Sequence, residues 1–456
     1  MPRPTELIAA LGTPAGTAAL AVLRVSGADT ARLVRELWGE LPPARRARRA
    51  DYRDAGGTLV DDVLYTFFAG PNSYTGEDAL EISCHGNPFI AQKILEDLFN
   101  RGCRPAEPGE FTQRAFLNGR MDLSQAEAVM DLIHARSERA LAAAHQQLRG
   151  ALGRKMEALI ERLLGVLAQV EAYIDFPDED LPAENRAAVL AAVQAILRET
   201  EQLLATSHYG EMLREGIKTV IVGEPNVGKS SLLNRLIGRD RALVSPEPGT
   251  TRDFIEERLL VGGHGLRLID TAGLNRNAPQ ALEKLGMEKT GEQVEAADLF
   301  LWVLDATALN ELNTKRLSER MAPDNTVVVL NKCDLAPISE MKSMPAPLAG
   351  LPVVQVSAQT GAGISALLTE IEKLADGFQR QQGGELIVIN ARHAHALTSA
   401  QTCLRAAIAR LSRADRAVEL LASELRGALE ALGEISGRVD NERMLDHLFA
   451  SFCIGK

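Results

Sequence analysis

The sequence predicts a multidomain chain that combines α/β domains with all-α segments. Short β-rich runs and Gly/Pro-containing loops indicate an α/β domain over residues 1–118. Ala, Leu, Glu, Gln and Arg recur in helical period over residues 119–215 and again over residues 378–456. Between them, residues 216–377 alternate β-rich runs with helices, which is typical of a mainly parallel sheet. We therefore expect an N-terminal α/β domain, a discontinuous helical domain, and a second α/β domain inserted into it.

Individual elements follow from the local patterns. In the N-terminal domain, Leu20–Val25 and Ala79–Cys84 are β-rich runs between turn signals. An inserted domain needs its two ends close together, so we expect residues 216 and 377 to be neighbours. One amphipathic helix has its apolar face at Leu159, Leu163, Val166, Leu167 and Val170. The strands expected in the inserted domain are Thr219–Val222, Leu266–Ile269, Leu299–Leu304, Thr326–Leu330 and Val353–Val356.

Composition narrows the class of protein. With 456 residues, 46% apolar and 24% charged, the chain has the composition of a globular protein of about three domains. Its net charge of −11 gives no global positive field toward nucleic acid or anionic lipid. A local basic run remains, which we interpret as a solvated loop rather than a nucleic-acid site. The run consists of Arg45, Arg46, Arg48 and Arg49.

Cysteine usage and the N-terminus point to a cytoplasmic protein. The five cysteines are odd in number and show no C-x-x-C spacing, which argues against disulfides or structural zinc. The N-terminus lacks the pattern of a signal peptide, and no run of about 18 apolar residues predicts a membrane span. The cysteines are Cys84, Cys103, Cys333, Cys403 and Cys453.

A phosphate-binding loop is predicted at Gly223–Ser230, which fits the pattern G-x-x-x-x-G-K-[ST]. The loop follows an expected strand and opens a helical run, as this motif requires. Its glycines let successive backbone N–H groups curl around phosphate oxygens at a helix N-terminus. Lys229 would reach the β- and γ-phosphates, and the Ser230 hydroxyl would ligate Mg²⁺.

Three downstream motifs identify the nucleotide. Asp270-Thr271-Ala272-Gly273 ends a strand where a Mg²⁺-linked aspartate and a γ-phosphate-sensing N–H belong. Asn331-Lys332-Cys333-Asp334 ends the next apolar strand, and the Asp334 carboxylate can accept both donors of guanine. Adenine offers no such donor pair. Ser357-Ala358 would support the base through backbone N–H groups. Four motifs in this order predict an inserted P-loop GTPase domain.

The segment Ser245–Asp253 fits a switch loop, with Thr251 as the second protein ligand of Mg²⁺. Leu274 follows Gly273 where many small GTPases carry a water-orienting glutamine, so catalysis requires another group. Glu283, Glu288 or a partner are candidates, although Glu283 by itself also reads as a solvated helix residue. The residues expected to contact GTP are Asn226, Val227, Gly228, Lys229, Ser230, Ser231, Ser245, Pro246, Glu247, Pro248, Gly249, Thr250, Thr251, Asp270, Thr271, Ala272, Gly273, Asn331, Lys332, Asp334, Ser357 and Ala358.

Blocks outside the nucleotide domain resemble the MnmE (TrmE) family of tRNA-modification GTPases, and the resemblance covers nearly all 456 residues. These blocks are Leu23–Gly27, Ser73–Asp78, Glu81–Gly86, the stretch from Pro108–Thr112 to Gln125–Glu127, and Phe452–Lys456.

The resemblance implies an N-terminal domain that homodimerises and binds 5,10-methylene- or 5-formyl-tetrahydrofolate. Family function is modification of the wobble uridine of certain tRNAs at C5, giving aminomethyl or carboxymethylaminomethyl groups. A flavoprotein partner, MnmG, supplies FAD in a hetero-oligomer. Carried over, the folate contacts fall on Arg24, Glu81, Arg120 and Lys456. Arg120 stands where the family commonly has lysine, which keeps the positive charge but changes its shape.

The family also implies catalytic roles in the GTPase domain. Its members are similar in using K⁺, here held by Asn226 and by the switch loop at Ser245, Glu247 and Thr250. The cation would be held only when two nucleotide domains meet face to face, and would supply charge where other GTPases use an arginine finger, while Lys229 keeps its role at the phosphates. The motif-matching glutamate is Glu283, which would orient the attacking water.

Other residues leave alternatives open. Cys453, near the folate site, reads equally as a nucleophile or proton donor and as a buried small residue that locks the tail. His85 reads as structural or folate-adjacent. A ribosome-assembly RNA-binding GTPase is the alternative function, although the C-terminal helices show no KH-type G-x-x-G loop. A scaffold with a vestigial site conflicts with the intact motifs.

Overall fold

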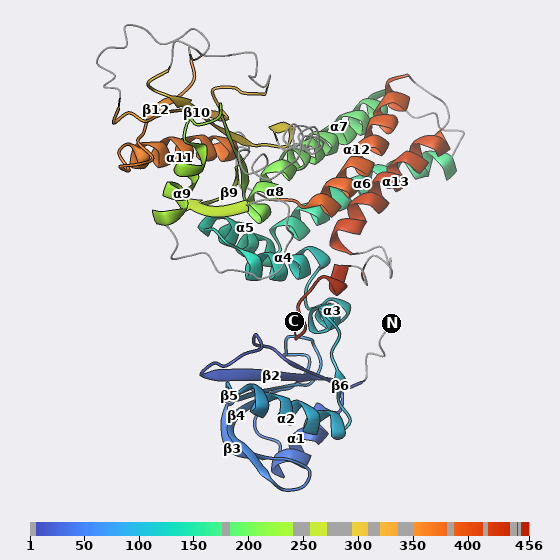
Figure 1. Ribbon diagram of the computed structural model, residues 1–456. Coiled ribbons are helices and arrows are strands. Elements are labelled where there is room, and N and C mark those ends of the chain that lie inside the picture. Colours follow the sequence, from blue (N-terminus) through green and yellow to red (C-terminus); the bar gives the residue numbers. More distant parts are fainter. Residues whose placement is uncertain are drawn as a thin grey trace, which may run out of the picture. The chain divides into compact units, whose positions relative to one another are not determined.

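The computed structural model describes residues 6–175, 183–239, 256–270, 294–308, 320–335, 348, 350–380, 387–413, 418–437, 445 and 448–455 (Figure 1). The chain forms two compact units. The first comprises Met1–Met130, Leu148–Glu161 and Leu429–Lys456, and the second Asp131–Gln147 and Arg162–Ala428.

A six-stranded sheet forms the N-terminal domain, with strand order β3-β4-β5-β2-β1-β6. Neighbouring strands are antiparallel except β1 and β6. Both strands expected in this domain are present, as β2 and β5. The strands are β1 Ile8–Leu11, β2 Leu20–Ser26, β3 Arg48–Arg53, β4 Leu59–Phe68, β5 Ala79–His85 and β6 Arg104–Pro105.

One face of this sheet carries the core. Leu23 and Ile82 are fully buried there with residues of α1, Thr30–Trp38, and α2, Pro88–Asn100. Because side chains alternate across a strand, the intervening residues Arg24 and Glu81 lie on the opposite face. The expected loop at the basic run is partly wrong, since β3 begins at Arg48 and the edge strand continues through the second half of the run.

Three helices follow: α3 Glu110–Leu117, α4 Leu123–His134 and α5 Glu138–Leu148. Residues near the C-terminus return to this region. Phe449 and Phe452 form a buried cluster with Leu123 and Ala126 of α4. This cluster holds the chain's C-terminal residues against the segment that follows the N-terminal sheet.

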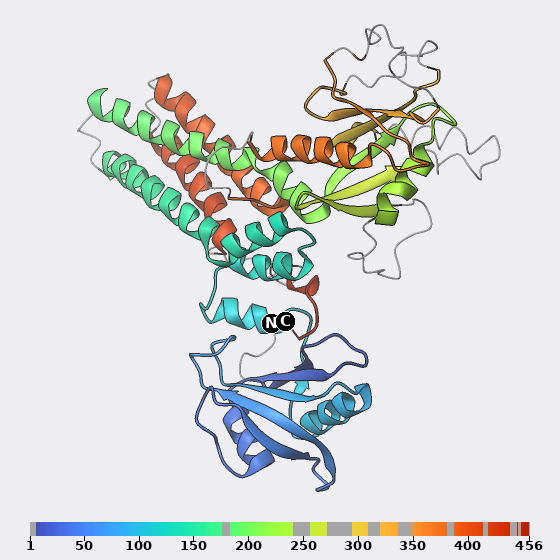
Figure 2. The same ribbon diagram turned by 90° about the vertical axis from the view of Figure 1, so that its left-hand side faces the viewer.

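Helices from two distant parts of the sequence lie side by side in one bundle (Figure 2). The bundle contains α6 Ala151–Asp175, α7 Ala183–Ala205, α12 Ala391–Ser412 and α13 Val418–Ser436. Ion pairs link helices of the two parts, as Arg405 to Glu201 and Arg426 to Glu171 do. The apolar face expected around Leu163 is buried. The discontinuous helical domain is therefore confirmed.

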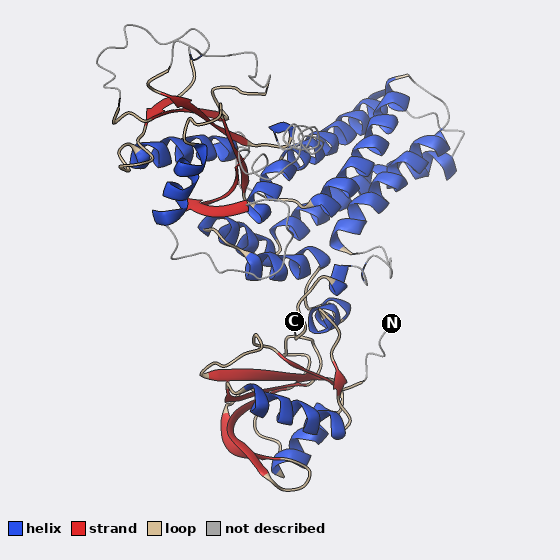
Figure 3. Ribbon diagram, in the orientation of Figure 1, coloured by secondary structure: helices blue, strands red, loops and turns tan. Residues whose placement is uncertain are grey.

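The inserted domain is built on a second six-stranded sheet, with order β12-β11-β10-β7-β9-β8 (Figure 3). All pairs are parallel except β8 and β9. The five expected strands are present, and β8 is an additional edge strand. The strands are β7 Ile217–Val222, β8 Glu256–Val261, β9 His264–Asp270, β10 Leu299–Asp305, β11 Thr326–Asn331 and β12 Val353–Gln355, with helices α9 Lys229–Arg239 and α11 Ile364–Arg380.

The entry and exit of the inserted domain lie together. The chain enters through α8, Ser207–Glu215, where Arg214 donates to the carbonyl of Ile389 at 3.3 Å. A Cβ on Gly210 would come within 2.3 Å of the same carbonyl oxygen, so only glycine fits there. Tyr209 and Met212 of α8 extend the apolar core of the inserted domain.

Among the described residues, no helix is both long enough and apolar enough to cross a membrane. All five cysteines are free thiols.

Candidate nucleotide-binding site

The predicted phosphate-binding loop joins β7 to α9. Gly223, with φ at 149°, sits so close to β10 that a Cβ would lie 2.3 Å from the carbonyl oxygen of Val303. Asn226 is exposed and adopts a left-handed conformation with φ at 64°. The loop then enters α9 at Lys229. This path leaves the backbone N–H groups of the loop at a helix N-terminus, where anions bind favourably.

The Lys229 ammonium lies inside the loop. Its Nζ donates to the carbonyls of Gly223 and Glu224 at 2.8 and 2.7 Å. The side chain is buried although it is charged. Backbone carbonyls of the loop therefore hold the ammonium in position.

Asn331, at the end of β11, ties two loops of the site together. Its Nδ2 donates to the carbonyl of Val227 at 2.8 Å, and its Oδ1 accepts from the N–H of Ala358 at 3.0 Å. A Cβ on Gly228 would lie 2.2 Å from Asn331 Nδ2, so glycine is required next to the amide. The side chain is almost fully buried. One neutral amide thus connects the phosphate loop with the last loop of the domain.

Lys332 follows with φ at 64° and turns its ammonium toward Asp305, at the end of β10. Its Nζ lies 2.6 Å from Asp305 Oδ2. Burial would raise the pKa of Asp305, but hydrogen bonds from Lys332 and Thr307 outweigh it and hold that pKa below its ordinary value. The pair keeps the loop after β11 close to the end of β10.

Asp334, predicted to read the base, is exposed at this same end of the sheet. The neighbouring loop is buried at Ser357, whose Oγ accepts from the N–H of Thr360 at 3.1 Å. Arg235 of α9 donates to the carbonyls of Ala358 and Gln359. No sequence pattern points to Arg235, because its role depends on where α9 packs.

Ser230 and Ser231 lie in the first turn of α9. The other predicted nucleotide and metal contacts fall outside the described residues or have undescribed side chains. The backbone of Asp270 ends β9, as expected, but the structure does not describe its side chain. Glu283 is also outside, so its two interpretations stay open. The others are Ser245, Pro246, Glu247, Pro248, Gly249, Thr250, Thr251, Thr271, Ala272 and Gly273.

A second group of predicted residues gathers on the open face of the N-terminal sheet. Arg24 and Glu81 are register partners on β2 and β5, and Arg24 Nε lies 3.1 Å from Glu81 Oε1. The same guanidinium donates to the carbonyl of Gly455 at 3.4 Å. Gly455 passes so close to β1 that a Cβ would lie 2.4 Å from the carbonyl oxygen of Leu11. Lys456 is outside the described residues.

The loop Ser73–Asp78 borders this group. Tyr74 donates to or accepts from Thr112 of α3 at 2.9 Å. Burial raises the pKa of Tyr74, and Thr112 and the nearby Arg24 act in the opposite direction. Arg120 is exposed, and its aliphatic stem lies against Gly76.

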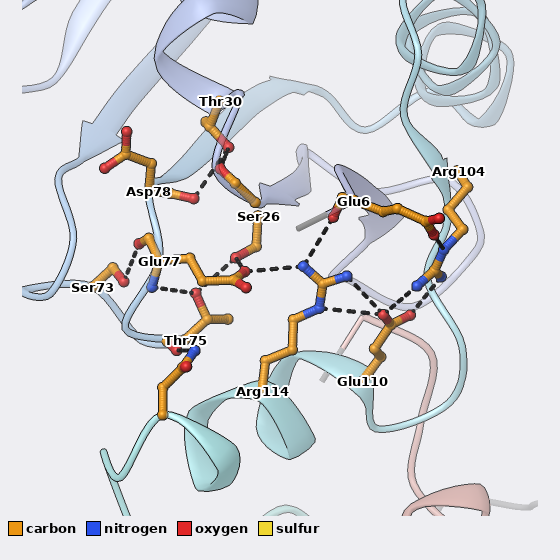
Figure 4. Close-up of polar contacts among 12 residues, drawn as sticks. Glu6, Ser26, Thr30, Ser73, Thr75, Glu77, Asp78, Arg104, Glu110 and Arg114 are labelled. Atoms are coloured by element: carbon orange, nitrogen blue, oxygen red, sulfur yellow. Dashed lines mark hydrogen bonds and ion pairs between the residues drawn. The ribbon is translucent and has the colours of Figure 1, made fainter. Parts of the chain in front are cut away.

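A buried arginine–glutamate cluster fixes that loop to the sheet and to α3 (Figure 4). Glu110 accepts from Arg114 at 2.9 Å and from Arg104 at 2.6 and 2.8 Å. Arg114 also donates to Glu77 at 3.0 Å, and Glu77 accepts from Ser26 at 2.8 Å. Burial would raise the pKa of Glu110, but hydrogen bonds, led by that from Arg104, hold it below its ordinary value.

Two residues with open interpretations are now placed. The Cys453 side chain is exposed, and its carbonyl accepts from the N–H of Gly109 at 3.3 Å. The interpretation of Cys453 as a buried small residue is therefore wrong. His85 is exposed, with Nδ1 2.8 Å from Asp61 Oδ1. No cluster of metal-ligating side chains occurs in the part of the chain that the structure describes.

The mainly parallel sheet, the phosphate-binding loop after β7 and the Asn331 bridge define the inserted domain as that of a P-loop nucleotide-binding protein. Two protein families match the chain: the MnmE helical domain over residues 123–453 and the GTP-binding protein TrmE N-terminus over residues 7–120. The chain therefore belongs to the MnmE family of tRNA modification GTPases, which sets aside the ribosome-assembly alternative.

Individual relatives agree along the full length. The tRNA modification GTPase MnmE of Opitutus terrae is 58% identical over 456 residues, covering 100% of both chains. That of Akkermansia muciniphila is 44% identical over 464 residues, also covering 100% of both. A solved G domain of the T. maritima FeoB iron transporter is 26% identical and covers 34% of this chain and 97% of that chain. Its TM-score of 0.24 adds nothing to the assignment.

Proposed function

We propose that this protein is a K⁺-stimulated GTPase that acts as a homodimer with the flavoprotein MnmG. Together they would modify C5 of the wobble uridine of certain tRNAs, using a tetrahydrofolate one-carbon unit and the partner's FAD. The family membership supports the general function. A cytoplasmic location fits the free thiols.

The Asn331 bridge is the observation that carries the GTPase part of the proposal. It brings the loop for the phosphates and the loop for the base to one end of the sheet. Only glycine fits at residues 223 and 228, so the backbone approaches closely where phosphate oxygens would bind. The arrangement fits a guanine nucleotide, with the Asp334 carboxylate free to face solvent and accept from the base.

Within this site, the residues divide the catalytic tasks. Lys229 and the loop N–H groups would stabilise phosphate charge. Ser230 and Thr251 would hold Mg²⁺, a cation that prefers hydroxyl and phosphate oxygens. Glu283 would orient the water that attacks the γ-phosphate.

The K⁺ site is proposed at Asn226 together with Ser245, Glu247 and Thr250. Asn226 fits the role because its side chain is exposed on a residue of the phosphate-binding loop with φ at 64°. K⁺ would supply positive charge at the transferring phosphoryl group, as an arginine does in other GTPases.

For the N-terminal domain, 1–118, we propose folate binding by Arg24, Glu81, Arg120 and Lys456. Arg24 donates to the carbonyl of Gly455, two residues after the exposed Cys453, and its guanidinium is suited to a carboxylate or pterin. Cys453 would then act as nucleophile or proton donor in one-carbon transfer. The helical domain, 119–215 and 378–456, would carry the GTPase domain, 216–377.

The decisive experiment is GTP turnover in matched KCl and NaCl, with MnmG, folate and tRNA present in a parallel assay of modified nucleosides. We expect turnover in Na⁺ to be lower by about tenfold or more, because loss of the stabilising charge raises the activation free energy by at least about 1.4 kcal/mol. Equal rates in the two salts would remove the K⁺ role. GTP turnover without any modified uridine would contradict the tRNA role.

Asn226→Gly is the matched variant for the cation. Glycine adopts φ at 64° without strain, so only the side chain is lost. It should bind GDP normally and turn over GTP equally slowly in both salts.

A further inference from the structure

The β8–β9 hairpin joins the two predicted nucleotide-sensing segments. β8, Glu256–Val261, directly follows the predicted switch loop, and β9, His264–Asp270, ends at the first residue of the Asp-Thr-Ala-Gly motif. In GTPases such segments are ordered by the γ-phosphate and Mg²⁺ and are released on hydrolysis. Both open ends of this hairpin are thus attached to the parts of the chain that we expect to respond to nucleotide.

The closed end of the hairpin contacts the helical domain through one carboxylate. His264 is buried at the start of β9, and its Nε2 lies 2.9 Å from Asp376 Oδ1 of α11. Arg139 of α5 donates to the same Oδ1. Burial, assisted by the nearby Arg139, lowers the pKa of His264 against the opposing effect of Asp376. The neutral ring therefore donates its Nε2–H, while Arg139 balances the charge of Asp376.

The turn itself has little room. A Cβ on Gly262 would overlap the carboxyl group of Glu372, with its carboxyl carbon 2.2 Å away. On the next residue, a Cβ on Gly263 would lie 3.8 Å from Glu138 Oε2 of α5. The turn is therefore enclosed between α11 and α5. A shift of the turn would therefore be felt first by side chains of both helices.

A separate attachment holds the middle of the same sheet. His208 of α8 lies 2.9 Å from Asp298 Oδ1, just before β10, and Asp298 Oδ2 accepts from the N–H of Lys218 on β7 at 2.8 Å. These strands are central, whereas β8 forms the edge of the sheet. α8 also contacts β9, where Arg267 Nη1 lies 3.2 Å from Glu215 Oε2. The turn end of the hairpin, held by Asp376 and Arg139, is the part attached to α5.

We propose that the β8–β9 hairpin transmits the nucleotide state of the GTPase domain to α5 of the helical domain, with Asp376 and Arg139 as positioning residues. The inference rests on the proposed binding of guanine nucleotide. It adds to that function a defined route from the nucleotide to the framework that carries the domain.

Hydrogen exchange of the full-length protein tests the route. Amides of α5 would be compared between the GDP-bound and GMPPNP-bound states, with binding of each nucleotide measured separately by fluorescence. In the wild type we expect exchange over α5 to differ between the states by about fivefold or more, within the usual range of allosteric coupling. Bound nucleotide with no difference at α5 would overturn the inference, whereas failure to bind would remove the proposed function as well.

Arg139→Gln is the test variant. It should abolish the difference at α5, retain GTP turnover within about twofold, and reduce uridine modification by a factor comparable to the lost coupling. Arg139→Lys should restore part of the difference. Arg162→Gln, which breaks the Arg162–Glu199 pair inside the helical bundle, is the control and should leave it unchanged. A nucleotide-dependent difference that persists in Arg139→Gln would refute the role of Arg139.

Discussion

Two regions of this molecule fasten a loop to a sheet with opposite chemistry. In the GTPase domain, the neutral Asn331 amide at the end of β11 holds the phosphate loop through the carbonyl of Val227. In the N-terminal domain, two arginines and two glutamates hold the Ser73–Asp78 loop. The nucleotide loops must exchange their contacts with a ligand, whereas the arginine–glutamate cluster lies beneath its proposed site and has no such task.

Buried charged groups suit a contact that stays fixed, and a neutral hydrogen bond suits one that must change. A buried ion pair resists rearrangement, because removing either partner leaves an uncompensated charge. A neutral amide contributes only about 1 kcal/mol net and can be replaced by another donor at low cost. The rigid part of the proposed folate site is thus ionic, whereas the link between the two nucleotide loops is a neutral amide.

The two tryptophans allow the regions to be observed separately. Trp38 stacks on Tyr65 in the N-terminal domain, with ring centroids 3.7 Å apart. Trp302 lies on β10 of the GTPase domain. Trp302→Phe leaves Trp38 as the reporter of the N-terminal domain, and Trp38→Phe leaves Trp302 as that of the GTPase domain.

The largest effect is expected from Glu110→Gln. It leaves Arg104 and Arg114 without their shared carboxylate at a site where Glu110 is 1% exposed. The N-terminal domain should lose about 3–5 kcal/mol of unfolding free energy, measured by urea titration of Trp38 fluorescence. The Trp302 transition should stay in place.

Asp62→Asn is the matched control, since it breaks the exposed pair of Asp62 with Arg49. Its cost should be far smaller than that of Glu110→Gln, because water screens an exposed ion pair. Similar losses in both variants would mean that burial of the cluster contributes nothing.

Gly228→Ala should weaken nucleotide binding by disturbing the contact between Asn331 and the phosphate loop. The methyl group would collide with Asn331 Nδ2, and φ at 98° already disfavours any residue but glycine. We expect GDP to bind about 30-fold more weakly, or about 2 kcal/mol, in a titration with a fluorescent GDP analogue. Gly238→Ala on the same helix has open space around its Cβ and should keep full affinity. Unchanged affinity in Gly228→Ala would show that the Asn331 bridge can shift freely.

Lowering the pH should destabilise the N-terminal domain, by less than Glu110→Gln does. Because the pKa of Glu110 is lowered in the folded state, its contribution is complete above the unfolded value near 4.3 and is lost as pH falls through the folded value. Each pKa unit corresponds to about 1.4 kcal/mol. Trp38-detected stability should therefore fall below about pH 4, and less steeply in Glu110→Gln. A slope unchanged by that substitution would assign the acid sensitivity to other carboxylates.

Much of the architecture was predictable from the sequence, because strands and the phosphate loop are encoded locally. β2 and the strands that precede each nucleotide motif were found where periodicity and turn residues placed them. Arg235 and the partners of Arg114 could not be found this way, since they depend on which elements pack together. The antiparallel β8 was missed for a similar reason, because its pairing partner defines it.

The Asn331 bridge also bears on how a nucleotide would leave. Opening the phosphate loop breaks the bond to Val227, and opening the last loop breaks the bond to Ala358, yet both bonds belong to one side chain. The two loops are therefore one unit of local unfolding. Departure of the base and departure of the phosphates become a single event, with no long-lived intermediate held by one end alone.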